Sequence, residues 1–94
     1  MSIEDIFSSR GRVRILKILI EIGELNISEI ARRARLNYST TNQHLQILYK
    51  AGLIRQKKFG RIRIFRVNKE NPRAKVIEEL IEIWGQTNKP NMQE

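Results

Sequence analysis

Polar side chains suited to the edges of DNA bases are concentrated in one short stretch of the sequence, residues 38–50. Asn and Gln can hydrogen-bond bidentately to adenine, and Ser and Thr can bind either a donor or an acceptor. Most exposed helix faces are rich in Glu and Lys, which favour helix, whereas Ser, Thr and Asn disfavour it. Poor helix formers at exposed positions therefore indicate selection for hydrogen bonding. The residues that carry this prediction are Ser39, Thr40, Asn42, Gln43 and Gln46.

A helix over residues 38–50, capped by Asn37, would turn these side chains to one side. At about 100° per residue, Thr41, Leu45 and Leu48 fall on one face and are predicted to be buried. The opposite face is polar and largely uncharged, and it carries Ser39, Gln43, Gln46 and Lys50.

Two further helices are predicted before this one. Asn26 and Glu29 form the pattern of a capping box, which predicts a short helix over residues 27–34. Ser9 is a suitable cap for a helix over residues 10–22. The apolar positions recur at three and four residues and form the predicted core: Val13, Leu16, Leu19 and Ile20 in the first helix, and Ile27, Ile30, Ala31 and Ala34 in the second.

The sequence then changes to β-branched and aromatic residues on either side of a glycine turn, which predicts a β-hairpin over residues 53–58 and 61–67. Both faces mix apolar and basic side chains, so the alternation leaves open which face is buried. Residues 51–70 hold seven basic residues and one acidic residue, in a chain with a net charge of +8. This concentration indicates a surface that binds a polyanion, although a basic surface that only keeps the protein soluble is the alternative. The bases predicted at the hairpin tip are Lys57, Lys58, Arg61 and Arg63.

A last helix is predicted over residues 73–84, with Pro72 at its first position and Asn71 as its cap. Its apolar residues cover more than one stripe, which is wider than a helix lying on a small domain needs. This excess predicts a dimer interface shared with the amphipathic segment of residues 2–7, and burial within one subunit is the alternative. The predicted interface residues are Ile3, Ile6, Val76, Ile77, Leu80, Ile81 and Trp84.

The chain of 94 residues is the size of one domain, predicted to span residues 1–85 and to be followed by a flexible tail over residues 86–94. It has no cysteine and one histidine, which argues against disulfides, thiol chemistry and a metal site. Because no Gly-rich phosphate loop or nucleophile–base pair is visible, we expect neither an enzyme nor a cofactor. The lack of a long apolar run or signal peptide predicts a cytoplasmic, nucleoid-associated protein without membrane contact.

Three helices followed by a basic β-hairpin is the order of a winged helix-turn-helix. The predicted fold is thus α+β but mainly α, a three-helix core plus a β-hairpin wing, with N- and C-terminal dimerisation helices. From residue 6 to residue 68 the chain also resembles the winged-helix repressors of the ArsR type. The stretches that carry the resemblance are GRVRILKIL, ELNISEIARRARLNYSTTNQHLQIL, YKAGLI and GRIRIFRVN.

The resemblance implies a homodimer that places two recognition helices in successive major grooves and lays its wings along the flanking backbone. His44 is either a contact to DNA, a pH switch or a partly buried helix residue, and Tyr38 either contacts the backbone or simply packs. By position, the resemblance implies DNA contacts at Tyr38, Ser39, Thr40, Asn42, Gln43 and His44, and phosphate contacts at Lys57, Lys58, Arg61 and Arg63.

Two features depart from the family's pattern. Metal-sensing members use cysteines or clusters of histidine and acidic residues, which this chain lacks, so the resemblance implies a member that does not sense metals. The family also usually has glycine in the turn between the two helices, where this chain has Arg35. This departure predicts a left-handed conformation at a residue other than glycine.

We therefore expect a homodimeric, sequence-specific transcriptional regulator that binds double-stranded DNA. Its recognition helix, residues 38–50, would enter the major groove, and its wing, residues 53–67, would lie on the flanking backbone. One alternative is an architectural protein that coats DNA with little sequence preference. The other is a winged-helix module for protein contacts, with the last helix as its main surface.

Overall fold

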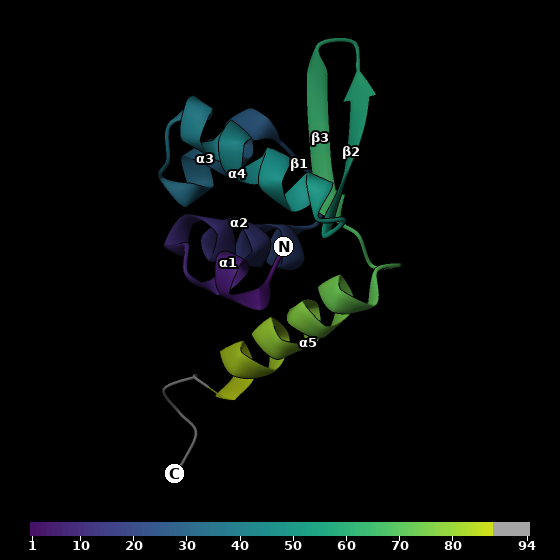
Figure 1. Cartoon of the computed structure of the whole chain (residues 1–94). Coiled ribbons are helices and arrows are strands. Elements are labelled where there is room, and N and C mark those ends of the chain that lie inside the picture. Colours follow the sequence, from purple (N-terminus) through teal and green to yellow (C-terminus); the bar gives the residue numbers. More distant parts are fainter. Residues whose placement is uncertain (88–94) are drawn as a thin grey trace.

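The computed structural model describes residues 1–87, and within them the chain forms five helices and a three-stranded sheet (Figure 1). Helices α1 to α4 gather together, the β2–β3 hairpin projects from them, and α5 lies on the side away from the hairpin tip. The predicted winged helix-turn-helix, mainly α, is confirmed. The elements are α1 (Ile3–Phe7), α2 (Arg10–Ile22), β1 (Leu25–Asn26), α3 (Ile27–Ala34), α4 (Tyr38–Lys50), β2 (Ile54–Phe59), β3 (Ile62–Val67) and α5 (Pro72–Thr87).

Polar caps set the start of α2, α3 and α4. The side-chain oxygens of Ser9, Asn26 and Asn37 accept hydrogen bonds from the backbone N–H groups three residues further on, at 3.2, 2.9 and 2.7 Å. These bonds satisfy N–H groups that have no partner within the helix. The Glu29 carboxylate binds Arg32 Nη2 at 2.7 Å. The bounds predicted for all three helices are confirmed.

The hydrophobic core is centred on α2, which contacts α1, α3, α4, α5 and β3. The buried faces predicted for α3 and α4 are confirmed. In α2, Leu16 and Leu19 are buried as predicted, whereas Val13 and Ile20 are half-buried and Ile15 is fully buried instead. The prediction for α2 was wrong in part because neighbours surround this helix on several sides, so its buried face is not a single stripe.

The sheet has the strand order β1-β3-β2, and both pairings are antiparallel. Strand β2 lies one residue further along the chain than expected, and β3 begins one residue later. The two-residue strand β1 was not predicted, since its partner lies far along the sequence: Leu25 pairs with Phe65. This pairing joins the wing to the loop that follows α2.

One face of the hairpin packs on the helices and the other is open. Phe65 and Val67 are buried at 0% and 5% exposure, together with Ile54 of β2. Because side chains alternate along a strand, Phe59 and Ile62 point the other way, and both are exposed. The question that the sequence left open is thereby answered: the face carrying Phe65 is the buried one.

Helix α5 begins at Pro72, as predicted, and extends to Thr87, beyond the expected end near Trp84. The predicted tail, residues 86–94, therefore starts within a helix. Residues 88–94 of that tail lie outside the described residues.

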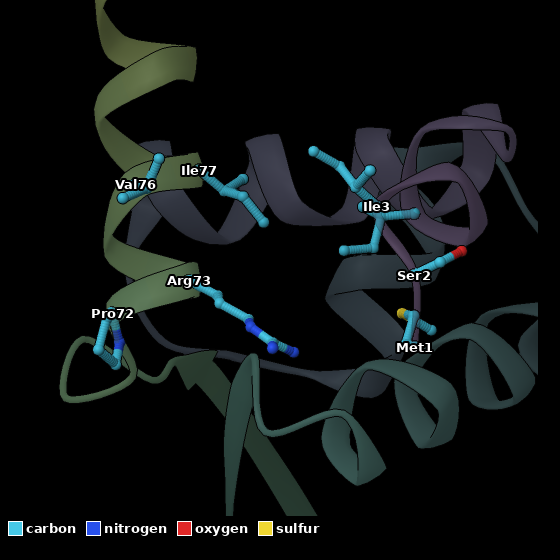
Figure 2. A pocket seen from close by; sticks show the side chains of 8 residues that line it. Met1, Ser2, Ile3, Pro72, Arg73, Val76 and Ile77 are labelled. Atoms are coloured by element: carbon cyan, nitrogen blue, oxygen red, sulfur yellow. The ribbon is translucent and has the colours of Figure 1, made fainter.

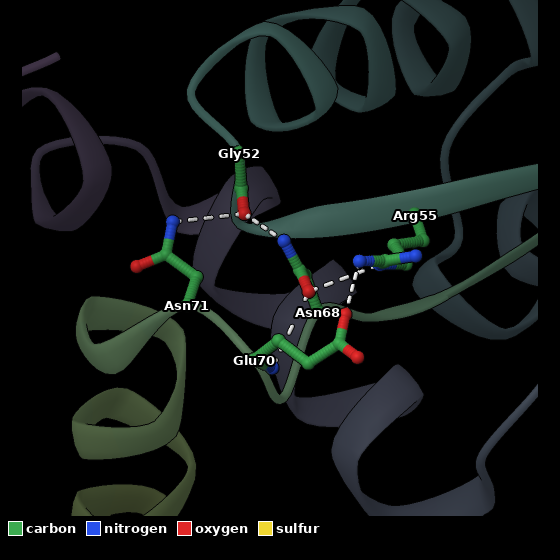
Figure 3. A network of polar contacts seen from close by, with 5 residues as sticks. All are labelled: Gly52, Arg55, Asn68, Glu70 and Asn71. Atoms are coloured by element: carbon green, nitrogen blue, oxygen red, sulfur yellow. Dashed lines mark hydrogen bonds and ion pairs between the residues drawn. The ribbon is translucent and has the colours of Figure 1, made fainter.

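A polar network joins the end of α4 to the start of α5 (Figure 3). The backbone carbonyl of Gly52 accepts hydrogen bonds from the side-chain amides of Asn68 and Asn71, at 2.9 and 3.0 Å. Arg55 of β2 donates to Asn68 Oδ1 at 3.1 Å and forms an ion pair with Glu70. These contacts fix the direction in which the chain leaves the hairpin and enters α5.

Candidate nucleic-acid interface

The turn between α3 and α4 is made by a left-handed residue other than glycine. Arg35 has φ 58° and ψ 43°, and it is the one non-glycine residue with positive φ in residues 1–87. The N–H of Leu36 donates to the carbonyl of Ala31 at 3.1 Å, and Arg14 of α2 donates to the carbonyl of Ala34 at 2.7 Å. The left-handed conformation predicted for Arg35 is confirmed. The two hydrogen bonds fix the C-terminal end of α3 next to the start of α4.

Helix α4 turns a stripe of uncharged polar side chains away from the core. Thr41, on the opposite side, is fully buried, and its hydroxyl donates to the backbone carbonyl four residues earlier at 2.8 Å. Tyr38, at the first position of the helix, is 54% exposed. Among the residues predicted to read bases, Ser39 and Gln43 are exposed, and Thr40 and Gln46 are half-buried.

Asn42 lies at the edge of α4 that faces the wing. Nη2 of Arg63, on β3, donates a hydrogen bond to Asn42 Oδ1 at 2.7 Å. The guanidinium carbon of Arg63 also lies 5.6 Å from the centre of the Phe65 ring, within reach of a cation–π interaction. The sequence predicted a base contact for Asn42 and a phosphate contact for Arg63 separately. The structure brings the two side chains together, and no local sequence pattern signals this pair.

His44 lies at the edge of α4 that faces α2. A Cβ atom on Gly11 of α2 would lie 2.7 Å from His44 Nε2, so the imidazole occupies the space that a side chain would take. His44 Nδ1 is buried and has no hydrogen-bond partner among the described residues. Burial of the ring and, second, the charge of Arg12 lower the pKa of His44. The half-buried ring of His44 packs against α2. Contact between His44 and DNA stays a prediction.

The basic residues of the wing divide between the two faces of the hairpin. Lys58 and Arg63 are cross-strand partners on the face that packs on the helices, so they lie on the same side as α4. Lys57 belongs to the opposite face, where its Nζ forms an ion pair with Glu24 at 3.2 Å. Arg61 is exposed beside the turn. The pairing of Lys57 with Glu24 was not predicted, because Glu24 precedes β1 and lies far from the hairpin in sequence.

A groove of about 530 Å³ lies between the N-terminal segment and the start of α5 (Figure 2). Ile3 and Ile6 line it on one side, and Val76 and Ile77 line it on the other. Ile6 and Ile77 are buried within the subunit, whereas Ile3 and Val76 are 65% and 61% exposed. Farther along α5, the other predicted interface residues are Leu80 and Trp84, which are exposed, and Ile81, which is half-buried.

The described part of the chain, residues 1–87, contains no helix of the length and apolar character needed to cross a membrane. It also contains no group of three or more His, Cys, Asp or Glu side chains arranged to hold a metal ion. On α5, Glu78 forms an ion pair with Lys69 at 3.6 Å.

The family described as "Bacterial regulatory protein, arsR family" matches residues 9–56, which is just over half of the chain. The chain belongs to the arsR family. This arsR-family protein is a winged-helix DNA-binding regulator, and its family and fold are those of transcriptional regulators rather than enzymes. The matched residues run from the cap of α2 into β2, so they contain the whole helix-turn-helix.

Solved structures share the fold of this arsR-family protein at low sequence identity. HlyU from Vibrio cholerae in its reduced form is 23% identical, with 89% of this chain and 82% of that chain covered and a TM-score of 0.73. The transcriptional repressor BigR from Xylella fastidiosa is 16% identical, with coverages of 93% and 83% and a TM-score of 0.77.

A third similar structure is a homodimeric winged helix-turn-helix DNA-binding domain of a possible ArsR-family regulator from Mycobacterium bovis. It is 20% identical, with coverages of 96% and 81% and a TM-score of 0.71. No curated protein sequence matches.

Proposed function

We propose that the protein is a homodimeric, sequence-specific regulator that inserts α4 into the major groove of operator DNA and lays its wing on the flanking backbone. One observation carries this proposal: the uncharged polar stripe of α4 and the bases Lys58 and Arg63 lie on the same side of the molecule. Such a surface combines groups that distinguish bases with groups that bind phosphates. Residues 1–85 act as one DNA-binding domain. The proposed base and backbone contacts are Tyr38, Ser39, Thr40, Asn42, Gln43 and Gln46 on α4, and Lys58, Arg61 and Arg63 on the wing.

Lys57 and His44 have lesser parts in this proposal. The ion pair with Glu24 reduces the charge that Lys57 offers to a phosphate, and it draws the side chain to the open face of the hairpin. His44 supports α4 from the side of α2, in the space that the absent side chain of Gly11 leaves. In this proposal, both residues therefore support the DNA-binding surface and are not among its main contacts to DNA.

Dimerisation is proposed through the apolar surface of α1 and α5. Ile3, Val76 and Leu80 expose 65%, 61% and 45% of their surface in the subunit, on neighbouring parts of this surface. Burial of such side chains stabilises association, at about 25 cal/mol for each Å² of apolar surface removed from water. The homodimeric state of the similar domain from Mycobacterium bovis supports a homodimer here, and the exposed apolar side chains are the basis for placing its interface on α1 and α5.

Selection of bound sequences from a pool of random double-stranded DNA tests the proposal. A two-fold symmetric consensus is expected, with half-sites about 10 bp apart from centre to centre. Equal retention of all sequences would instead favour an architectural protein that coats DNA. Failure to retain any DNA at low salt would favour a module for protein contacts. The selection therefore separates the three functions in a single measurement.

A further inference from the structure

The bond between Arg63 and Asn42 restricts which part of the Asn42 amide can face DNA. A guanidinium group donates hydrogen bonds and accepts none, so the atom of Asn42 within 2.7 Å of Arg63 Nη2 must be the amide oxygen. The amide nitrogen is then the end of the side chain left for other partners. It offers donors alone, because both hydrogens of a side-chain amide are on nitrogen.

Arg63 is well placed to keep this bond while α4 binds DNA. The residue is half-buried on β3, and its guanidinium carbon lies 5.6 Å from the ring of Phe65, which is fully buried. A guanidinium carries five N–H donors in a fixed geometry, so a bond to Asn42 leaves further donors for a phosphate. Contact with the DNA backbone thus need not release Asn42.

We propose that Arg63 is a specificity-determining residue that makes Asn42 read a base offering acceptors alone, guanine or thymine, instead of adenine. An asparagine with both ends unoccupied pairs bidentately with adenine, because its oxygen accepts from N6 and its nitrogen donates to N7. Arg63 occupies one of the two lone pairs of the Asn42 oxygen and holds that oxygen toward the wing, so Asn42 does not present its acceptor and donor side by side as adenine requires. Guanine presents N7 and O6, and thymine presents O4, to the remaining donor. The inference rests on the proposed function, since it assumes that α4 lies in the major groove.

Two variants test the inference by changing what the position presents to DNA. Arg63→Met keeps an unbranched side chain beside Phe65 and releases the Asn42 oxygen, so the preferred base should change from guanine or thymine to adenine. Asn42→Asp keeps a partner for Arg63 but presents an acceptor in place of a donor. Its preference should therefore shift to cytosine or adenine, whose amino groups donate. Each change should alter the ratio of affinities between matched probes by about tenfold.

The matched control is Lys58→Met. Lys58 is the cross-strand partner of Arg63, lies on the same face and carries the same charge, but its bonding partners do not include a base-reading side chain of α4 in the described structure. This variant should weaken binding to all sequences alike and leave base preference unchanged. The base pair read by Asn42 is identified first, as the position whose preference disappears in Asn42→Ala. Circular dichroism establishes that each variant is folded.

The possible results separate the inference from the function on which it rests. If the wild-type protein selects a sequence and Arg63→Met behaves like Lys58→Met, Arg63 binds phosphate only and the inference is wrong. A wild-type preference for adenine at the Asn42 position would also overturn it. If the wild-type protein shows no sequence preference, the proposed function fails, and this inference fails with it. A switch to adenine in Arg63→Met, together with a shift to cytosine or adenine in Asn42→Asp, would support it.

Discussion

The imidazole of His44 rests on the backbone of α2 at Gly11, where a Cβ atom would approach Nε2 to 2.7 Å. Contact this close is possible because glycine has no side chain. The middle of α4 is thereby supported by α2 on one edge, while Arg63 supports it on the other. The groups proposed to read DNA are thus held from both sides.

Gly11→Ala should stabilise the protein only when His44 is also removed. Alanine favours helix over glycine by about 0.8–1 kcal/mol, but here the added methyl group displaces the imidazole and offsets that gain. In the His44→Ala background the clash is absent, so the full gain should appear in urea unfolding. Gly85→Ala is the control, since a Cβ at Gly85 meets no atom within 4 Å. Equal gains in both backgrounds would show that the contact with His44 is unimportant.

The stability of the protein should fall as the pH drops below the ordinary pKa of histidine. Burial first, and Arg12 second, lower the pKa of His44 from 6.5. Between the lowered and the ordinary pKa the unfolded chain binds more protons, so stability rises with pH. The contribution of His44 is complete above about pH 6.5 and is lost as the pH falls through its folded pKa.

Urea unfolding at about pH 7.5 and about pH 5.5 measures this loss, and His44→Gln provides the control. The pKa values of Asp5 and Glu29 are also lowered, by hydrogen bonds from Ser2 and from Arg32. Their ordinary values are 3.8 and 4.5, so their contributions are lost at lower pH, outside this window. An unchanged pH dependence in His44→Gln would contradict the assignment.

Arg35→Gly should stabilise the protein by about 0.5–1 kcal/mol. The left-handed conformation costs a residue with a Cβ about 1–2 kcal/mol, and glycine returns part of that through its greater freedom in the unfolded chain. Arg35→Ala keeps the left-handed strain and removes the charge, so it should give no such gain. Thermal unfolding of the three proteins at equal concentration distinguishes the backbone effect from the loss of charge.

Val76→Glu should convert the proposed dimer to monomer. The carboxylate would be buried against apolar side chains of the partner. Such burial costs on the order of several kcal/mol unless the charge is paired. Sedimentation equilibrium gives the oligomeric state. Ile62→Glu changes a residue of similar exposure, 54% against 61%, on the open face of the wing, so it should leave the dimer intact. A dimer that survives Val76→Glu, or one that Ile62→Glu alone dissociates, would place the interface elsewhere.

Lys58→Ala should flatten the salt dependence of DNA binding by about one unit of slope. Lys57→Ala should change it less, because Lys57 is already paired with Glu24 at 3.2 Å. Affinities measured over a series of salt concentrations give both slopes. If the two slopes fell equally, the two faces of the hairpin would contribute alike to binding.

Local signals in the sequence were sufficient for most of the helices. Caps such as Ser9, Asn26 and Asn37 act within one turn of themselves, so the residues alone indicated where α2, α3 and α4 begin. The left-handed turn at Arg35 followed from the resemblance to a family with glycine at that position. The breadth of the apolar surface on α5 was predicted from the spacing of the apolar residues in that segment alone.

Contacts between distant residues were beyond the reach of these signals. The strand pairing of Leu25 with Phe65, and the ion pair of Glu24 with Lys57, depend on how the wing returns to the loop after α2. The bond of Arg63 to Asn42 depends on the angle between β3 and α4. Periodicity describes the faces of one element at a time, so it does not say which faces of two elements meet.

The backbone carbonyl of Gly52 links the end of α4 to the start of α5. It accepts hydrogen bonds from both Asn68 and Asn71, so the end of α4 and the start of α5 are held within a few bonds of each other. In a dimer built through α5, the separation of the two α4 helices would then be set by a short and rigid path. Each added base pair moves a half-site by about 3.4 Å and turns it by about 35° around the DNA axis. The proposed dimer would therefore bind weakly to an operator whose half-sites are one base pair further apart than its preferred spacing.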